Sequence, residues 1–97
     1  MSQIDLIATI SVPEDRLSAA SALLLAYGEV VRAEPGNHRF EVYVDHQASA
    51  LVVIERYADA DAFDAHLANP ANAEFNSNLA EVLGGGGSTL QMLDFLA

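Results

Sequence analysis

LVVIERY, residues 51–57, decides the fold, because its first four residues are apolar without interruption. A strand in a sheet with helices on only one side alternates apolar and polar residues, whereas these residues predict a strand that is covered on both faces. The chain has 97 residues, enough for one domain but not for a second covering layer. We therefore expect a second copy of the chain to supply that layer, so that the protein is a homodimer.

The segments before residues 51–57 predict a strand, a long helix and a second strand. Residues 4–12 alternate with a period of two, which is typical of a strand. Pro13 can open the helix that follows, and apolar residues then recur at helical spacing over residues 14–33. Residues 40–45 predict another strand, and the short turn between them and residues 51–57 favours an antiparallel hairpin.

The segments after residues 51–57 predict two short helices and a last strand. Asp59 is suited to cap the first helix, and Asn69-Pro70 interrupts the helical stretch before the second one begins. Four glycines at residues 84–87 then link this helix to an apolar strand at residues 89–96. The apolar stripes comprise Phe63, His66, Leu67 and Pro70 in the first helix, and Phe75, Leu79, Val82 and Leu83 in the second.

The predicted elements follow the order β-α-β-β-α-β over a single domain, residues 1–97. This order predicts a ferredoxin-like α+β fold, in which a four-stranded antiparallel sheet carries helices on one face. The uncovered face of the sheet would then meet the same face of the second copy.

The charge of the chain is one-sided and limits its partners. Fourteen acidic residues oppose four arginines, and the formal net charge is -10. Such a surface repels phosphate backbones and anionic lipid, so we expect no nucleic-acid partner and no membrane surface. Strongly anionic substrates are disfavoured for the same reason, unless an arginine is placed beside them.

Cysteine is absent, which excludes a disulfide scaffold, a thiolate nucleophile, a cysteine zinc site and an iron–sulfur cluster. No apolar run approaches the roughly 20 residues of a membrane span. Residues 1–5 lack the basic start and the apolar stretch of a signal peptide. We therefore expect a cytoplasmic protein.

Several blocks of the sequence resemble the antibiotic biosynthesis monooxygenase family, in the right order and spacing. They are Arg32–Asn37 with Arg39–Val42, Val53–Tyr57, Asp59–Phe63, Ala65-His66-Leu67 and Asn69-Pro70. The resemblance implies a dimeric α+β barrel, in which two sheets pack face to face and each subunit keeps a pocket between its sheet and its helices. Some members oxidise aromatic polyketides or hydroquinones with molecular oxygen and without metal or flavin, others degrade haem, and others isomerise small hydroxyketones.

The sequence departs from these relatives at one notable position. Relatives often have a histidine directly after the proline that follows the helix, whereas Ala71 follows Pro70 here. The haem-degrading members rely on a tryptophan and on a histidine further along the last helix. This chain has no tryptophan, and residues 72–83 contain no histidine, which argues against haem degradation.

His66 is the leading candidate for a catalytic residue. Its place beside Phe63 and Leu67 on the apolar stripe points it into the space under the helices. Because the pKa of histidine lies near neutrality, it could take a proton from a phenol or hydroquinone. The alternative is a core histidine that is bonded to a residue of the sheet. His38 and His46 are expected at exposed turn ends, and the three histidines lack metal-ligand spacing, so we expect no metal.

The remaining candidates are polar and aromatic residues of the predicted pocket. Glu55 shares a strand face with Tyr57, so it either faces the helices, where it could orient His66, or faces the partner subunit as an interface group. The other expected pocket residues are Phe63, Tyr27, Asn69, Asn72 and Phe75.

These observations favour an enzyme similar to a cofactor-independent monooxygenase, acting on a small aromatic or quinol-type substrate with His66 as the base. Two alternatives stay open at this point. One is an isomerase of a small hydroxyketone that uses His66 for proton transfer, and the other is a non-catalytic dimer that binds a small molecule or is associated with stress.

Overall fold

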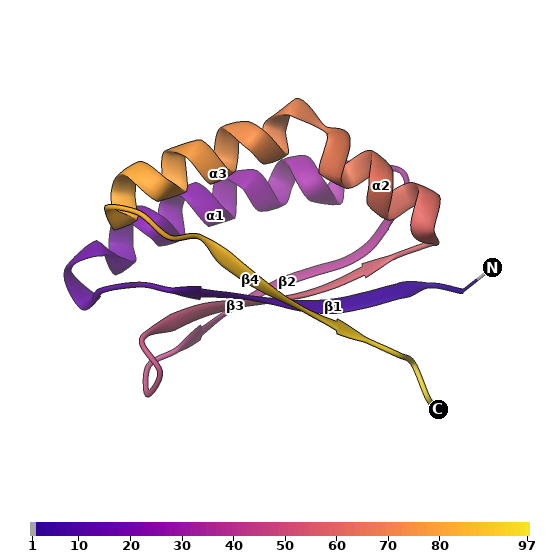
Figure 1. Cartoon of the computed structure of the whole chain (residues 1–97), viewed down its shortest axis with the longest axis horizontal. Coiled ribbons are helices and arrows are strands. Elements are labelled where there is room, and N and C mark those ends of the chain that lie inside the picture. The colour runs from indigo at the N-terminus through magenta and orange to yellow at the C-terminus, as the bar shows by residue number, and fades with distance from the viewer. Residues whose placement is uncertain (1) are drawn as a thin grey trace.

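A four-stranded antiparallel sheet with the strand order β2-β3-β1-β4 forms one layer of the molecule, and helices form the other. The computed structural model describes residues 2–97, and Figure 1 shows the helices on one side of the sheet. This arrangement confirms the predicted ferredoxin-like α+β fold. The elements are β1 (Ile4–Ser11), a 3₁₀ turn (Glu14–Arg16), α1 (Leu17–Arg32), β2 (Asn37–Asp45), β3 (Ala50–Tyr57), α2 (Ala60–Ala68), α3 (Pro70–Leu83) and β4 (Ser88–Leu93).

Some predicted boundaries were wrong by a few residues, for identifiable reasons. The predicted helix over residues 14–33 begins as a 3₁₀ turn, where the Arg16 amide donates to the Pro13 carbonyl at 2.9 Å. The last strand ends at Leu93 rather than at residue 96, because Leu93 pairs with Asp5 close to the start of β1. Only Ile4 of β1 lies beyond that pair, so β1 offers too little strand to extend β4 as far as residue 96.

The break between α2 and α3 lies where the sequence predicts it. Asn69 is extended, as expected before a proline, and its side-chain oxygen accepts a hydrogen bond from the Ala71 amide at 3.0 Å. Asp59 caps α2 in the same way, through the Ala62 amide at 2.8 Å. The two caps mark the ends between which α2 packs against β3 and α3.

The hydrophobic core lies between the sheet and the helices. Alternate residues of β1 and β3 point to the helix side and are buried, while the residues between them face the opposite side. The core includes Leu6, Ala8, Ile10, Leu51 and Val53 from the sheet, and Ala20, Leu24, Val31, Phe75 and Leu79 from the helices.

The opposite face of the sheet has no helix over it in residues 2–97 (Figure 1). Ile7 and Ile54 pair across β1 and β3 on this face and are only half-buried, as is Val52. Arg56 and Asp5 form an ion pair at 2.7 Å beside them. The face is therefore an apolar centre with a charged edge, and its burial by a second copy stays a prediction.

Gly36 lies where the turn before β2 packs against α2. The Gly36 carbonyl accepts a hydrogen bond from the Ala58 amide at 2.9 Å, and a Cβ added at Gly36 would overlap the side chain of Ala62. We expect Gly36→Ala to lower the free energy of unfolding by about 1–3 kcal/mol, because packed backbone on both sides must move apart. Chemical denaturation measures this change.

The matched control is Gly87→Ala, since a Cβ there meets nothing within 4 Å and the residue has no left-handed φ. This control should leave the free energy of unfolding nearly unchanged. Adding Ala62→Gly to Gly36→Ala should restore part of the loss, and purely additive effects of the two substitutions would contradict the steric explanation.

Candidate active site

A cavity of about 340 Å³ lies between the inner face of the sheet and the helices. Its walls are mainly apolar, and they come from all four strands, the three helices and the glycine segment before β4. The polar groups that face it include His66, Glu55, Asn72 and Asn76. A largely apolar pocket with a few convergent polar groups is the usual form of a small-molecule site.

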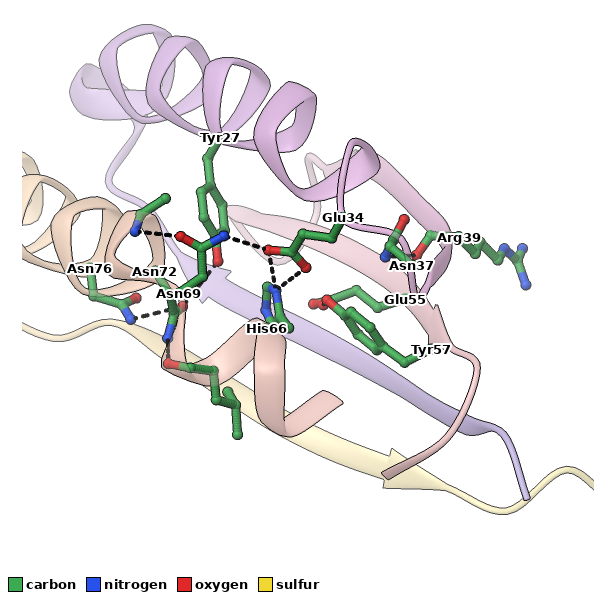
Figure 2. A network of polar contacts seen from close by, with 12 residues as sticks. Tyr27, Glu34, Asn37, Arg39, Glu55, Tyr57, His66, Asn69, Asn72 and Asn76 are labelled. Carbon is green, nitrogen blue, oxygen red and sulfur yellow. Dashed lines mark hydrogen bonds and ion pairs between the residues drawn. The ribbon is translucent and has the colours of Figure 1, made fainter. Parts of the chain in front are cut away.

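His66 projects inward from α2 and is buried, with 6% of its surface exposed. Its Nδ1 lies 2.9 Å from Oε1 and 3.3 Å from Oε2 of Glu34, in the turn between α1 and β2. The side-chain amide of Asn69 donates to the same carboxylate at 3.1 Å. Figure 2 shows these three side chains converging from three different segments. Because a carboxylate accepts, Nδ1 carries the hydrogen, and in the neutral imidazole Nε2 then keeps a free lone pair.

The second ring nitrogen of His66, Nε2, differs from Nδ1 in its environment. Within residues 2–97, every side-chain nitrogen or oxygen that is fully shielded from solvent has a hydrogen-bond partner. Nε2 has no partner among these residues, so it is not one of the fully shielded atoms. The atom is therefore accessible, and His66 lines the cavity. A histidine that is held by a carboxylate on one nitrogen and open on the other can accept a proton and is stabilised when it becomes charged.

Aromatic rings surround His66, and all of them except that of Tyr57 also line the cavity. The ring centroid of Tyr57 lies 4.9 Å from that of His66, and Phe63 and Tyr27 lie at 6.2 Å. Tyr27 stacks on Phe75 with 4.3 Å between ring centroids and 4° between planes. The rings leave His66 little rotational freedom, so its free nitrogen keeps a fixed direction.

Tyr27 is held at its hydroxyl as well as at its ring. The hydroxyl donates to Oδ1 of Asn72 at 3.0 Å, and the Asn72 amide donates to the Leu67 carbonyl at 3.3 Å. Burial raises the pKa of Tyr27, and the Glu34 and Glu55 carboxyls raise it further, so the hydroxyl stays protonated as a donor. This chain of contacts joins α1 to α3 across the top of the cavity.

Glu55 also points to the helix side, with 6% of its surface exposed. The hydroxyl of Tyr57 donates to Oε1 of Glu55 at 2.7 Å, and both side chains extend from β3 toward His66 in Figure 2. Burial raises the pKa of Glu55, and this effect outweighs the Tyr57 hydrogen bond and the nearby His66, which lower it. The pKa of Tyr57 is also raised by burial and by the adjacent Glu55.

The structure brings together all eight residues that the sequence suggested for the site. Six of them line the cavity directly, and two support it through contacts with residues that line it. The six are His66, Phe63, Glu55, Tyr27, Asn72 and Phe75, and the two are Tyr57 and Asn69. The shared face of Glu55 and Tyr57 is confirmed, and it is the helix face.

The partner of His66 differs from both sequence expectations. Glu55 faces the helices, but its hydrogen bond goes to Tyr57, and His66 is bonded to Glu34 rather than to a residue of the sheet. Glu34 was missed, although its position in the turn directly after α1 was a usable signal, because such turns lie at the end of the helix layer. Asn76 was also missed, and its spacing of four residues from Asn72 places it on the same side of α3.

His38 and His46 are exposed, as expected. Within residues 2–97, no group of three or more histidine, aspartate or glutamate side chains is arranged to hold a metal ion. The helices of this same range are each too short or too polar to cross a bilayer.

The fold and the site together define a small α+β protein with a buried histidine–carboxylate pair beside an apolar cavity. The chain belongs to the antibiotic biosynthesis monooxygenase family, whose sequence profile matches residues 4–78. The resemblance seen in the sequence is thereby confirmed over most of the chain.

Individual relatives agree with this assignment. The Mycobacterium tuberculosis protein named "Putative monooxygenase Rv0793" is 32% identical over 82 residues, which is 84% of this chain and 81% of that protein. Its structure superimposes with a TM-score of 0.88 at 29% identity, over 99% of this chain and 97% of that one. PA3566 from Pseudomonas aeruginosa gives a TM-score of 0.86 at 26% identity, over 100% and 97% of the two chains. A Caulobacter crescentus structure gives 0.89 at 19% identity, over 99% and 92%, which shows the fold alone.

Proposed function

We propose that the protein is a cytoplasmic monooxygenase that needs no metal or flavin and acts on a small aromatic or quinol-type substrate in the cavity. The observation that carries this proposal is the orientation of His66, whose Nδ1 is held by Glu34 while Nε2 opens into an aromatic-walled pocket. Membership of the family and similarity to a protein named as a monooxygenase support the reaction class.

The chemistry balances without an external reductant. His66 takes a proton from the activated carbon or hydroxyl of the substrate, which leaves an electron-rich anion. The anion passes one electron to dioxygen, and the substrate radical and superoxide recombine to a peroxide. Loss of water from the peroxide converts a CH₂ group and O₂ into a C=O group and H₂O, so the substrate supplies all the electrons that reduce the oxygen.

The charges around the cavity favour an uncharged substrate. The lining residues include Glu55 but neither lysine nor arginine within residues 2–97. Arg39 and Arg56 are neighbours across β2 and β3 on the opposite face of the sheet, where they form ion pairs with Glu41 and Asp5. Arg32 donates to the Phe40 carbonyl at 2.9 Å and 3.1 Å. A carboxylated substrate would therefore enter without a counter-ion, which is costly in an apolar pocket.

Oxygen uptake tests the proposal. The purified protein is incubated with a panel of neutral hydroquinones and anthrone-like phenols, together with carboxylated analogues, in an oxygen electrode cell. We expect one O₂ consumed per ketone or quinone formed, with one atom of labelled O₂ in an anthrone-derived product. Product formed without oxygen uptake would point to the isomerase alternative, and thermal stabilisation by ligand without product would point to the binding alternative.

Glu34→Gln should slow this reaction by roughly 10–100-fold in kcat, with a smaller effect on KM, because Glu34 positions His66 and does not line the cavity. The amide can present either its oxygen or its NH₂ group to Nδ1, so the required tautomer is no longer enforced. Glu29→Gln, on the exposed side of α1, is the matched control. Equal kcat values in the two variants would refute the positioning role of Glu34.

A further inference from the structure

Glu55 has one oxygen that the protein does not use. Tyr57 donates to Oε1, but no group in residues 2–97 bonds to Oε2. Since every fully shielded polar side-chain atom of these residues has a partner, Oε2 is accessible, and Glu55 lines the cavity. A buried carboxyl that lines a substrate pocket and keeps one oxygen free and accessible is in a position to exchange a proton with the bound molecule.

Among residues 2–97, no arginine or lysine is one of the groups that stabilise Glu55 as an anion. Tyr57 lies on its own strand, His66 faces it from α2, Glu34 from the turn after α1, and Tyr27 from α1. Its neighbours on the adjacent strands are Phe40 on β2 and Leu6 on β1, which are apolar. Burial raises the pKa of Glu55, and the negative charge of the nearby Glu34 carboxylate raises it further.

We propose that Glu55 is a second catalytic residue of this site and works as the acid that protonates the substrate peroxide. This role rests on the proposed oxygenase function and completes its proton balance. His66 takes the first proton from the substrate, and dioxygen adds to give a peroxide anion. Glu55 then donates its proton to the terminal peroxide oxygen and becomes a carboxylate.

The last step returns both groups to their starting states. The Glu55 carboxylate removes the remaining C–H proton, the O–O bond breaks, and the leaving hydroxide takes the proton from the imidazolium of His66. The products are a carbonyl group and water, and no proton is gained or lost by the protein over the cycle. The two groups lie at the same end of the cavity, linked through Tyr57, whose ring neighbours His66 and whose hydroxyl bonds to Glu55.

Glu55→Gln tests this role, because the amide keeps the size of the side chain and an oxygen that can accept from Tyr57 but cannot give up a proton. We expect kcat for oxygen uptake to fall roughly 10²-fold while KM changes little. The activity of the unmodified protein should fall as pH rises through the raised pKa of Glu55, since the acid is then lost, and this alkaline limb should be absent in the variant. Glu81→Gln, on the exposed side of α3, is the matched control.

Two further measurements separate the proposal from loss of fold and from failure of the proposed function. Infrared spectroscopy without substrate, followed over pH, should show a protonated carboxyl band that persists above the ordinary titration range of glutamate, because the pKa of Glu55 is raised. Glu55→Gln should remove this band and Glu81→Gln should retain it. Tyr57→Phe should move the alkaline limb to higher pH, because the Tyr57 hydrogen bond lowers the pKa of Glu55. An absent band, or an unchanged kcat and pH profile in Glu55→Gln, would overturn the role of Glu55. A present band without oxygen uptake by the unmodified protein would overturn the oxygenase function and the peroxide step with it.

Discussion

His66→Ala is expected to lower kcat for oxygen uptake by roughly 10²–10⁴-fold, which is the usual contribution of a positioned general base. The imidazole offers a free ring nitrogen at the cavity, and no other histidine of residues 2–97 lines it. Steady-state kinetics with the best substrate of the panel measures the loss. Added imidazole should restore part of the activity, since the substitution opens space for it beside Glu34.

Two companion variants make this result interpretable. His38→Ala removes an exposed histidine and should leave kcat unchanged. His66→Gln keeps a hydrogen-bond donor for Glu34 but supplies no base, so it should be as inactive as His66→Ala while retaining more of the unfolding free energy. Full activity in either His66 variant would rule out the base role, whatever its stability.

Ile54→Lys is expected to convert a dimer into a monomer. Ile54 lies near the centre of the uncovered sheet face, beside Ile7 and opposite Glu41 on β2. In the single chain a lysine there can lie along Glu41 and reach water, so its cost to the isolated fold is small. Under a partner sheet the same charge is buried, and a two-fold interface contains it twice.

The expected effect on the dimer is large. A penalty of about 3 kcal/mol weakens dimerisation by a factor of roughly 10². Sedimentation or light scattering across a concentration series measures the shift, and the thermal midpoint should fall with the loss of the partner. Leu25→Lys, at a 57% exposed position on α1, is the control and should leave the mass unchanged. An unmodified protein that is a stable monomer at micromolar concentration would refute the account of residues 51–54.

Periodic features of the sequence predicted most of the fold. Alternation in β1 and the unbroken apolar start of β3 identified the central strands, and the caps Asp59 and Asn69 marked the starts of α2 and α3. Such features are local, because side-chain period and capping depend on residues within a few positions of one another. Contacts between distant segments leave no comparable pattern.

The candidate site shows this difference most clearly. His66 was identified from its place on the apolar stripe of a helix, whereas its partner Glu34 lies 32 residues away in a turn and follows no period. The exposure of β4 could not be predicted either. Leu90 and Met92 pair with Ala8 and Leu6 and so share their face, yet they are 47% and 53% exposed. An apolar pattern shows which side a residue faces, but not how far the covering helices extend.

Asn69 makes two kinds of contact with one side chain, since its oxygen caps α3 and its NH₂ group donates to Glu34. Aspartate would keep the cap but set a second carboxylate against Glu34, and serine would keep the cap with a hydroxyl too short to span the same gap. Alanine would lose both contacts. Few substitutions at residue 69 would therefore keep both contacts. A mutation at this one position changes the start of α3 and the surroundings of His66 together.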